Sequence, residues 1–252
     1  MSAVNLALRP IHYASVSGGK DSLYMMKVIL ANPQKYPLDL VVNYDLEIEP
    51  PVAHKVAGKI KEMCDRIGVQ FWSIKPRRSY QELEEKYYLP TRLARWCNSK
   101  YKLDCEAQLV EWIKAQNCRP VAYIGLCADE SRRFRDKVGD WKDEQRKCYP
   151  LAEEGIEEEM VLAWAKEQAI FEGFYLLQKR MGCVLCPCGS MRDWAITAIR
   201  YPELFAYWCE KMNRRDTDRP PRCDPWANKE RRIREKWVPK IMAEINEATD
   251  DR

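Results

Sequence analysis

The feature that most constrains the fold is a glycine-containing loop near the N-terminus, residues 17–22 (SGGKDS). A strand-like apolar run, Ile11–Val16, leads into this loop, and the residues after it, Ser22–Leu30, follow a helical pattern. Glycines let backbone N–H groups approach an anion closely, and the start of a helix adds partial positive charge. The lysine adds a point charge and the serines add hydroxyls. The loop therefore predicts a phosphate-binding turn that is typical of a nucleotide site.

The loop is not a Walker A motif, which requires the pattern G-x-x-x-x-G-K-[ST]. Ala14 stands where the first glycine of that motif would be, and Asp21 follows the lysine. A strand-to-helix turn without a ligand is the alternative interpretation. The complete six-residue string, placed between a strand and a helix, favours the nucleotide site.

Apolar runs and helical patterns alternate through the first half of the chain. This alternation predicts an α/β protein with a parallel twisted sheet and helices on both faces. Ligands bind such sheets at the carboxyl ends of the strands. We therefore expect the loop at Ser17, the turn at Asp45 and the turn Cys127–Glu130 to meet in one crevice. The expected strands are Ile11–Val16, Leu38–Tyr44, Val69–Ile74 and Val121–Leu126, and the expected helices are Ser22–Leu30, Ala53–Ile67 and Lys102–Gln116.

The pattern changes near Tyr149, after which helical periodicity dominates and no strand is expected beyond Leu126. Expected helices there are Glu153–Gln168, Pro202–Asn213 and Asn228–Ala248. We therefore expect a nucleotide-binding domain over residues 1–148 and a helical, cysteine-rich C-terminal region over residues 149–252.

The chain has 11 cysteines among 252 residues, an odd number that argues against a complete disulfide framework. The first ten residues do not resemble a secretory signal, and no window is apolar enough to span a bilayer. We therefore expect a cytoplasmic protein without a membrane partner, in which cysteines are reduced thiols or metal ligands.

Three cysteines, Cys183, Cys186 and Cys188, lie within six residues in a C-x-x-C-P-C pattern. This spacing lets thiolates face one metal ion or cluster. Cys97 is the expected fourth ligand, with Cys209 or Cys223 as alternatives. Buried apolar cysteines, or a redox dithiol formed by the first two, are the competing interpretations.

A [4Fe–4S] cluster is favoured over zinc at these cysteines. A zinc site usually has two spaced cysteine pairs or a pair with histidines. The two histidines of the chain, His12 and His54, are both far from the three cysteines in sequence. Zinc stays the alternative.

A nucleic-acid partner is not indicated by the overall charge, because 42 Lys and Arg nearly balance 38 Asp and Glu. A basic segment with aromatic residues, 214–237, is a candidate nucleic-acid surface. The spacing of Trp237, Ile241 and Ile245 favours a charged amphipathic helix instead.

The loop and the cysteine pattern together resemble the PP-loop ATP pyrophosphatase superfamily. They are most similar to its phosphoadenosine phosphosulfate (PAPS) reductase-like branch, which includes phosphorothioation-type sulfurtransferases. Three further segments carry the resemblance, which extends over residues 11–194: 95–102 (RWCNSKYK), 125–133 (GLCADESRR) and 148–151 (CYPL).

This resemblance implies an adenine nucleotide α-hydrolase-like fold and cleavage of ATP between the α- and β-phosphates, often leaving an adenylated substrate. Two departures separate this chain from the reductases of the branch. Asn98 follows Cys97 where iron–sulfur adenylylsulfate reductases carry adjacent cysteines, and no E-C-G-x-H motif occurs near the C-terminus. The resemblance therefore favours ATP-dependent adenylation that supports sulfur transfer. An adenylylsulfate or PAPS reductase and a non-catalytic nucleotide-binding subunit are the alternatives.

The resemblance also implies roles for residues. The loop would hold the leaving pyrophosphate, and Mg²⁺ would bridge phosphate oxygens beside Asp21 or Asp45. The implied catalytic residues are Lys20, Asp21 and Arg132. A sulfur-donor protein of the cysteine desulfurase type is an implied partner. Glu130 would orient Arg132 or cap its helix. The nucleotide-binding residues would be Ser17, Gly18, Gly19, Lys20, Asp21, Ser22, Asp45, Glu130 and Arg133.

Overall fold

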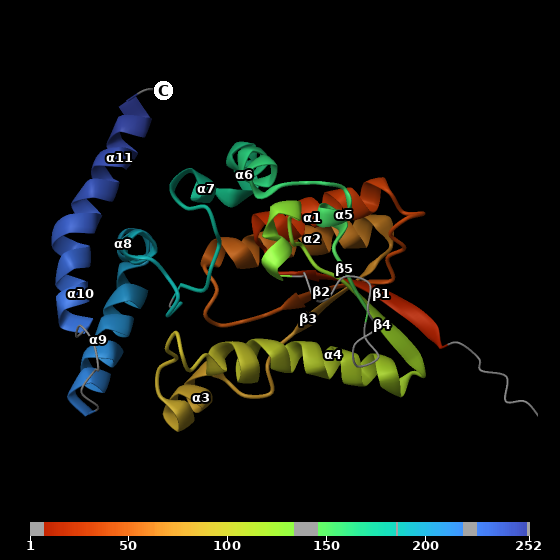
Figure 1. Ribbon diagram of the computed structural model, residues 1–252, viewed down its shortest axis with the longest axis horizontal. Helices are drawn as coiled ribbons and strands as arrows, with labels where there is room; N and C mark the ends of the chain where they lie inside the picture. The colour runs from red at the N-terminus through yellow and green to blue at the C-terminus, as the bar shows by residue number, and fades with distance from the viewer. Residues whose placement is uncertain (1–7, 134–145, 185, 219–225, 251–252) are drawn as a thin grey trace, which may run out of the picture. The chain divides into compact units, whose positions relative to one another are not determined.

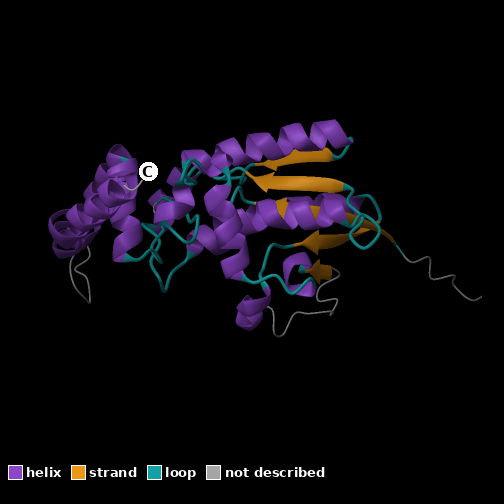
Figure 2. Cartoon of the chain, turned by 90° about the horizontal axis from the view of Figure 1, so that it is seen from above, coloured by secondary structure: helices purple, strands orange, loops and turns teal. Residues whose placement is uncertain are grey.

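A five-stranded parallel sheet forms the centre of the α/β part of the chain (Figures 1 and 2). The computed structural model describes residues 8–133, 146–184, 186–218 and 226–250. The strand order is β3-β2-β1-β4-β5, and each neighbouring pair is parallel. The predicted α/β class with a parallel sheet is therefore confirmed. The strands are β1 Arg9–Val16, β2 Leu40–Tyr44, β3 Gln70–Ile74, β4 Cys118–Tyr123 and β5 Arg146–Cys148.

The expectation of no strand after Leu126 is wrong. β5 has three residues and pairs with β4 at the edge of the sheet, with Tyr123 opposite Cys148. Its sequence, Arg-Lys-Cys, shows no alternation of apolar and polar residues, and so short a strand leaves no periodic signal.

The helices begin and end close to where the pattern places them in the first half of the chain. The helix expected over Glu153–Gln168 begins only at Glu158, as α6, because the short helix α5 ends at Glu153 and Gly155 adopts a positive φ of 68° between the two. Two helices that were not expected, α3 and α8, both begin with a capping box, formed by Ser79 with Glu82 and by Ser190 with Asp193. The α-helices are α1 Lys20–Ala31, α2 Pro51–Ile67, α3 Tyr80–Tyr87, α4 Leu103–Ala115, α5 Pro150–Glu153, α6 Glu158–Glu167, α7 Phe174–Leu177, α8 Met191–Arg200, α9 Pro202–Asp218, α10 Trp226–Arg232 and α11 Val238–Asp250; π-helices cover Cys97–Lys102 and Ile233–Trp237, and 3-10 helices cover Ala128–Arg133 and Ala169–Phe171.

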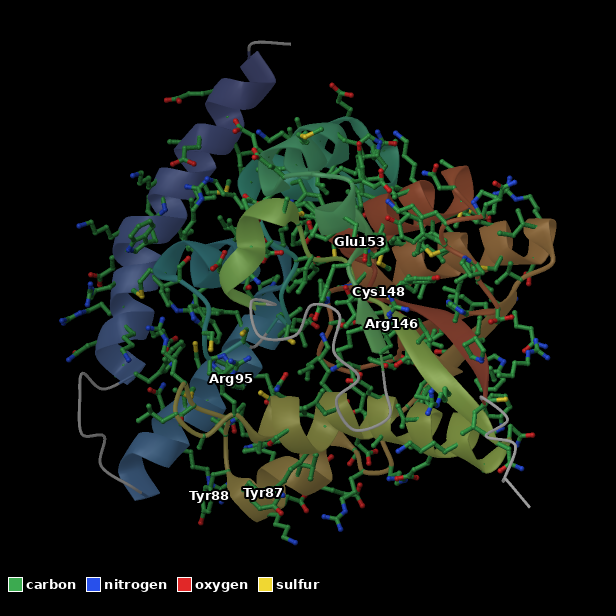
Figure 3. All side chains as sticks on the ribbon, turned by 45° about the vertical axis from the view of Figure 1, so that its right-hand side comes forward. Tyr87, Tyr88, Arg95, Arg146, Cys148 and Glu153 are labelled. Carbon is green, nitrogen blue, oxygen red and sulfur yellow. The ribbon has the colours of Figure 1, made fainter. Side chains whose placement is uncertain are left out.

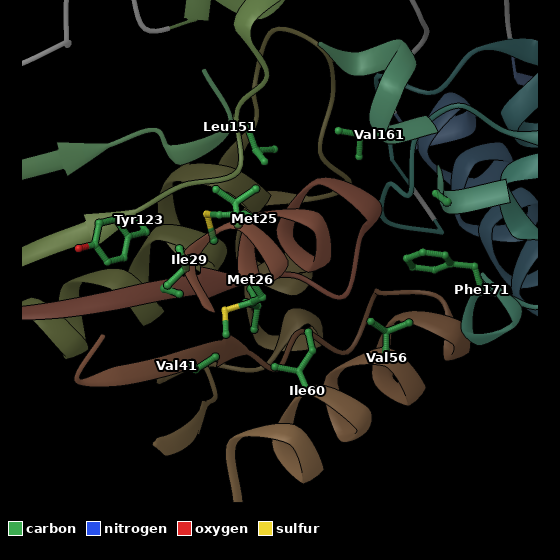
Figure 4. Packing of buried hydrophobic residues seen from close by; sticks show 14 of the residues in the cluster. Met25, Met26, Ile29, Val41, Val56, Ile60, Tyr123, Leu151, Val161 and Phe171 are labelled. Atoms are coloured by element: carbon green, nitrogen blue, oxygen red, sulfur yellow. The ribbon is translucent and has the colours of Figure 1, made fainter. Parts of the chain in front are cut away.

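Apolar residues of α1 are the centre of the main core (Figure 4). Met25 and Met26 are fully buried between the sheet and residues of α2 and α6, such as Ile60 and Val161. On the sheet side of α4, Ile113 is also fully buried. The packing fixes α1, and therefore the loop before it, at the end of β1.

The chain forms two compact units, which interleave in sequence. The first contains the sheet and comprises residues 1–46, 50–77 and 100–181; the second comprises residues 47–49, 78–99 and 182–252. The segment 149–181 therefore packs with the sheet, because its apolar residues, such as Phe171, belong to the main core. The boundary between two domains, placed between residues 148 and 149, stays a prediction.

The second unit has an aromatic core of its own. The ring of Trp194 stacks on Trp208 at a centroid distance of 5.5 Å and meets Trp226 edge-on at 5.1 Å. Ile241 of α11 is fully buried, in agreement with the amphipathic-helix interpretation. In the part of the chain that the structure describes, no helix combines the length and apolar character needed to cross a membrane.

Candidate functional site

The loop at residues 17–22 fits its surroundings only because two positions lack a side chain. Gly18 has a φ of 70°, and a Cβ there would lie 2.4 Å from the carbonyl oxygen of Ala53. A Cβ on Gly125, which follows β4, would lie 2.9 Å from the carbonyl carbon and oxygen of Asp21. The loop is therefore in close contact with α2 on one side and with the β4 turn on the other.

The backbone N–H groups of the loop are the basis of a candidate anion site. The first N–H groups of an α-helix have no acceptor within the helix. The Lys20 N–H donates to the Tyr175 hydroxyl at 2.7 Å, and the Ser17 N–H donates to Ser22 Oγ at 3.3 Å. The N–H groups of Gly18, Gly19, Asp21 and Ser22 have no acceptor among the residues that the structure describes. They are available to phosphate oxygens.

Lys20 lies inside this site with its charge balanced by two carboxylates. Its side chain is 1% exposed, and its Nζ lies 2.6 Å from Asp21 Oδ1 and 3.4 Å from Glu158 Oε1. The Glu158 N–H donates to Asp129 Oδ1 at 3.1 Å, which ties the start of α6 to the turn after β4. The ammonium is thus held beside the free N–H groups by two carboxylates, one from the loop and one from the start of α6.

Tyr175 of α7 is a rigid part of the same site. Its ring is 2% exposed and packs edge-on against Phe171 at 4.8 Å and Phe174 at 5.3 Å. Burial raises the pKa of its hydroxyl, so the group is protonated at neutral pH. It accepts from Lys20, and its own proton has no acceptor among the described residues. The hydroxyl therefore has a proton to donate beside the unpartnered N–H groups of the loop.

The turn after β4 meets the loop, as expected from the sheet. Cys127 Sγ lies 3.7 Å from Asp21 Oδ1, and Glu130 Oε2 accepts the Cys127 N–H at 3.3 Å. Glu130 therefore fixes the turn itself. Burial, with the nearby Asp21 charge, raises the pKa of the Cys127 thiol to about 12. This cysteine is a neutral thiol at neutral pH and not a nucleophile.

Asp45 follows β2 at the same edge of the sheet. Among the described residues, its carboxylate has no ion pair or hydrogen bond with the loop. Its carboxylate lies 3.7 Å from His54 Nδ1 and 3.6 Å from Lys75 Nζ. For Arg132 and Arg133 the structure describes the backbone, at the end of the 3-10 helix, and not the side chains. Their anion-clamping role, and a magnesium role for Asp45, stay predictions.

Sequence reasoning missed Tyr175 and Glu158 as site residues. Both lie in the segment that was assigned to a separate helical region. No motif surrounds Tyr175, and Glu158 is one of three consecutive glutamates, so no spacing singles it out. Only the packing of α6 and α7 against α1 reveals them.

The cysteine-rich loop of the second unit is held by consecutive turns. The Cys186 N–H donates to the Cys183 carbonyl at 3.1 Å, and the Gly189 N–H donates to the Cys186 carbonyl at 3.0 Å. Arg92 donates to the carbonyls of Pro187 and Gly189 at 3.3 and 3.4 Å. These backbone turns and the Arg92 side chain therefore support the described part of the loop.

Cys97 belongs to the same unit and begins a π-helix. Burial raises the pKa of its thiol, and negative charge on Cys186 and Cys188 raises it further, while the Arg95 guanidinium opposes this. These thiols are thus within electrostatic range of one another. Cys209 is instead buried beside Trp226 and Glu230, and burial raises its pKa to about 11.

Among the residues that the structure describes, no three His, Cys, Asp or Glu side chains are arranged to hold a metal ion. The donor chemistry of Cys97, Cys183, Cys186 and Cys188 suits an iron–sulfur cluster or zinc. Cys223, the other alternative ligand, lies outside the described residues.

A cavity of about 460 Å³ lies in the second unit, on the chain segment that contains Cys97. Two aromatic side chains, Tyr87 and Trp96, contribute to its wall. Figure 3 labels Tyr87 at the end of α3 and Arg95 in the segment that follows. The remaining lining residues are Ala94, Arg95, Asn98 and Ser99.

No protein-family model matches the chain. An uncharacterized protein of Methanocaldococcus jannaschii is 26% identical over 212 residues, which cover 79% of this chain and 47% of that protein. The chain therefore spans about half the length of this curated relative.

Two solved structures are similar to the chain. One is the U34-tRNA thiolase NcsA from Methanococcus maripaludis with its [4Fe-4S] cluster, at a TM-score of 0.40 and 13% identity, covering 96% of this chain and 74% of that chain. The other is PAPS reductase from Candida auris in a phosphate complex, at a TM-score of 0.40 and 14% identity, covering 72% of this chain and 84% of that chain. At these TM-scores the function has to be argued from this chain's own residues.

Proposed function

We propose that the chain is a PP-loop enzyme that cleaves ATP between the α- and β-phosphates and uses the adenylate for sulfur transfer. One observation carries the proposal. The SGGKDS loop follows β1 at the point where the chain order of the sheet reverses, because β2 and β4 lie on opposite sides of β1. Ligands of open parallel sheets bind at such switch points. The contact between Asp21 and Cys127 joins the two turns there.

The loop would hold the pyrophosphate that leaves. An oxygen of the acceptor attacks the α-phosphorus, the bond from that phosphorus to the bridging oxygen breaks, and pyrophosphate leaves with the electron pair. The free N–H groups and the Lys20 ammonium stabilise the charge that develops on it. Asp21 would help to hold a Mg²⁺ ion, which would neutralise phosphate charge. A sulfur nucleophile then displaces AMP from the acceptor, forming the bond to sulfur as the bond to oxygen breaks.

The sulfur would come from a donor protein of the cysteine desulfurase type. Three of the thiols of Cys97, Cys183, Cys186 and Cys188 would hold a [4Fe–4S] cluster, which would supply one open iron to carry the sulfur. Alternatively, the cluster or a zinc ion would be purely structural, and a thiol that is not its ligand, such as Cys188, would carry a persulfide. Arg92 and Arg95 would position this loop and its thiolates in either case.

Incubation with ATP labelled at the α-phosphate separates three functions. AMP and pyrophosphate that form only with an acceptor support the proposal. Sulfite release from adenylylsulfate or PAPS would support a reductase instead. ATP binding without turnover, weakened but not abolished in Lys20→Ala, would support a nucleotide-binding subunit.

A further inference from the structure

We propose that Glu158 makes the proposed phosphate site selective for ligands that arrive with a divalent cation. Its carboxylate occupies the place on the Lys20 ammonium that a phosphate oxygen takes, and it repels phosphates whose charge no metal has reduced. The inference rests on the proposed function for the identity of the site. It assigns a role in selectivity to a residue that lies outside the SGGKDS motif.

The Lys20 ammonium becomes available to a phosphate only after a partner leaves it. An ammonium has three donors. The described partners of Lys20 Nζ are Asp21 Oδ1 at 2.6 Å and Glu158 Oε1 at 3.4 Å. The Lys20 side chain is 1% exposed, so almost none of it is open to a ligand from solvent. A phosphate oxygen therefore reaches the ammonium by replacing one of the two carboxylates.

Glu158 is the partner that is more easily replaced. Asp21 belongs to the loop itself, makes the shorter contact and also accepts from Cys127 Sγ at 3.7 Å. The Glu158 contact is long, and among the described residues its carboxylate has no second hydrogen bond or ion pair. The Glu158 side chain is 36% exposed, so rotation about its own bonds carries the carboxylate into water.

Only the side chain of Glu158 has to move, because its backbone is bonded to the turn after β4. The Glu158 N–H donates to Asp129 Oδ1 at 3.1 Å, and the Ala128 N–H donates to the Ile156 carbonyl at 2.8 Å. Helix α6 also packs against α1 (Figure 1). The carboxylate therefore stays near the site after it leaves Lys20, and its charge continues to act on a bound phosphate.

The turn after β4 adds further negative charge beside the loop. Burial is the main cause of the raised pKa of the Cys127 thiol. The pKa is raised further by three carboxylates and lowered by one ammonium: Asp21, Glu130, Asp129 and Lys20. With Glu158, four carboxylates therefore lie around this ammonium, although one is enough to balance its charge. Such an excess weakens the binding of a free polyphosphate, and a divalent cation on the ligand reverses the local balance.

A purely structural role for Glu158 leads to the opposite expectation. If the carboxylate only held Lys20 in place, its removal would loosen the ammonium and weaken the binding of every phosphate ligand, with or without metal. The sign of the change in affinity and its dependence on metal therefore separate the two roles.

Isothermal titration calorimetry with α,β-methylene-ATP tests the inference, because this analogue cannot be cleaved between its α- and β-phosphates. In EDTA, Glu158→Gln should bind the analogue about tenfold more tightly than the wild-type protein, since a like charge near the ligand is removed. With Mg²⁺ the gain should shrink to about twofold, because the metal reduces the charge of the ligand. Glu157→Gln and Glu159→Gln are the matched controls. They remove the same charge from neighbouring exposed positions and should leave both affinities unchanged.

The outcomes separate this inference from the proposed function. Weaker binding by Glu158→Gln, an equal gain with and without Mg²⁺, or an equal gain in the two controls overturns the inference. If neither the wild-type protein nor Glu158→Gln binds the analogue, the inference and the proposed function both fail. The expected pattern of affinities in a chain that forms no AMP from ATP with any acceptor would leave the inference standing and remove the proposed function.

Discussion

The backbone N–H of Lys20 and the hydroxyl of Tyr175 are joined by a 2.7 Å hydrogen bond across 155 positions of the chain. This bond connects the first residue of α1 to α7. Helix α7 lies far in sequence from the SGGKDS motif that identifies the loop. Glu158 makes a second connection of this kind through the Lys20 ammonium. The loop, the β4 turn and the segment 149–181 are therefore joined around the proposed phosphate site.

Replacing Tyr175 with Phe should weaken pyrophosphate and ATP binding by about tenfold. The hydroxyl that accepts from Lys20 keeps its own proton, which would donate to a charged phosphate oxygen, and such bonds contribute about 1.5 kcal/mol or more. Isothermal titration calorimetry measures the change. Tyr24→Phe is the control, because Tyr24 also lies on α1 but packs edge-on against Trp164. Tighter binding by Tyr175→Phe would mean that the hydroxyl competes with phosphate for the Lys20 N–H.

Replacing Gly125 with Ala should distort the SGGKDS loop, although Gly125 is not part of that motif. The new methyl would lie 2.9 Å from the Asp21 carbonyl, so the β4 turn or the start of α1 must shift. We expect a loss of about 1–3 kcal/mol in unfolding free energy, as for other overpacked sites, together with weaker ATP binding. Gly58→Ala is the matched control, because nothing lies within 4 Å of its Cβ. It should be neutral or stabilising in urea titrations, and equal damage by both substitutions would contradict this account.

His12 should make the fold less stable as the pH falls below neutrality. Burial lowers the pKa of its ring below the ordinary 6.5, while Nδ1 lies 2.9 Å from the Tyr123 hydroxyl. Between the folded and unfolded pKa values the unfolded state binds more protons, so the unfolding free energy rises with pH there. Urea unfolding between about pH 5.5 and 7 should show this slope. His12→Gln should flatten it, and an unchanged slope in that variant would assign the effect to other groups.

Anaerobically purified protein should contain iron that depends on the cysteine-rich loop. We expect about four irons per chain with broad visible absorbance, and loss of both in Cys183→Ser and Cys186→Ser. Cys118→Ser, at the start of β4 in the other unit, should retain the iron. Colourless protein with one zinc per chain would replace the iron assignment, and metal-free protein with oxidised Cys183 and Cys186 would favour the redox dithiol.

The sequence could predict the parts of this protein that rest on local signals. Strands β1 to β4 and helix α1 follow from apolar periodicity, and the loop follows from its glycines and lysine. The three-residue β5 has no periodic signal. Gly155 interrupts an otherwise continuous helical pattern. The capping boxes at Ser79 and Ser190 are sequence signals that would have predicted the starts of α3 and α8. Tyr175 and Glu158 could not be found, because their roles depend on long-range packing against α1.

The central claim is that this loop directs cleavage between the α- and β-phosphates of ATP. The most direct measurement incubates the protein with Mg²⁺, α-labelled ATP and candidate acceptors and quantifies the products. We predict AMP and pyrophosphate in equal amounts, and neither in Lys20→Met, which keeps the buried stem but removes the ammonium. ADP and orthophosphate as the products, or equal AMP formation by Lys20→Met, would contradict the claim.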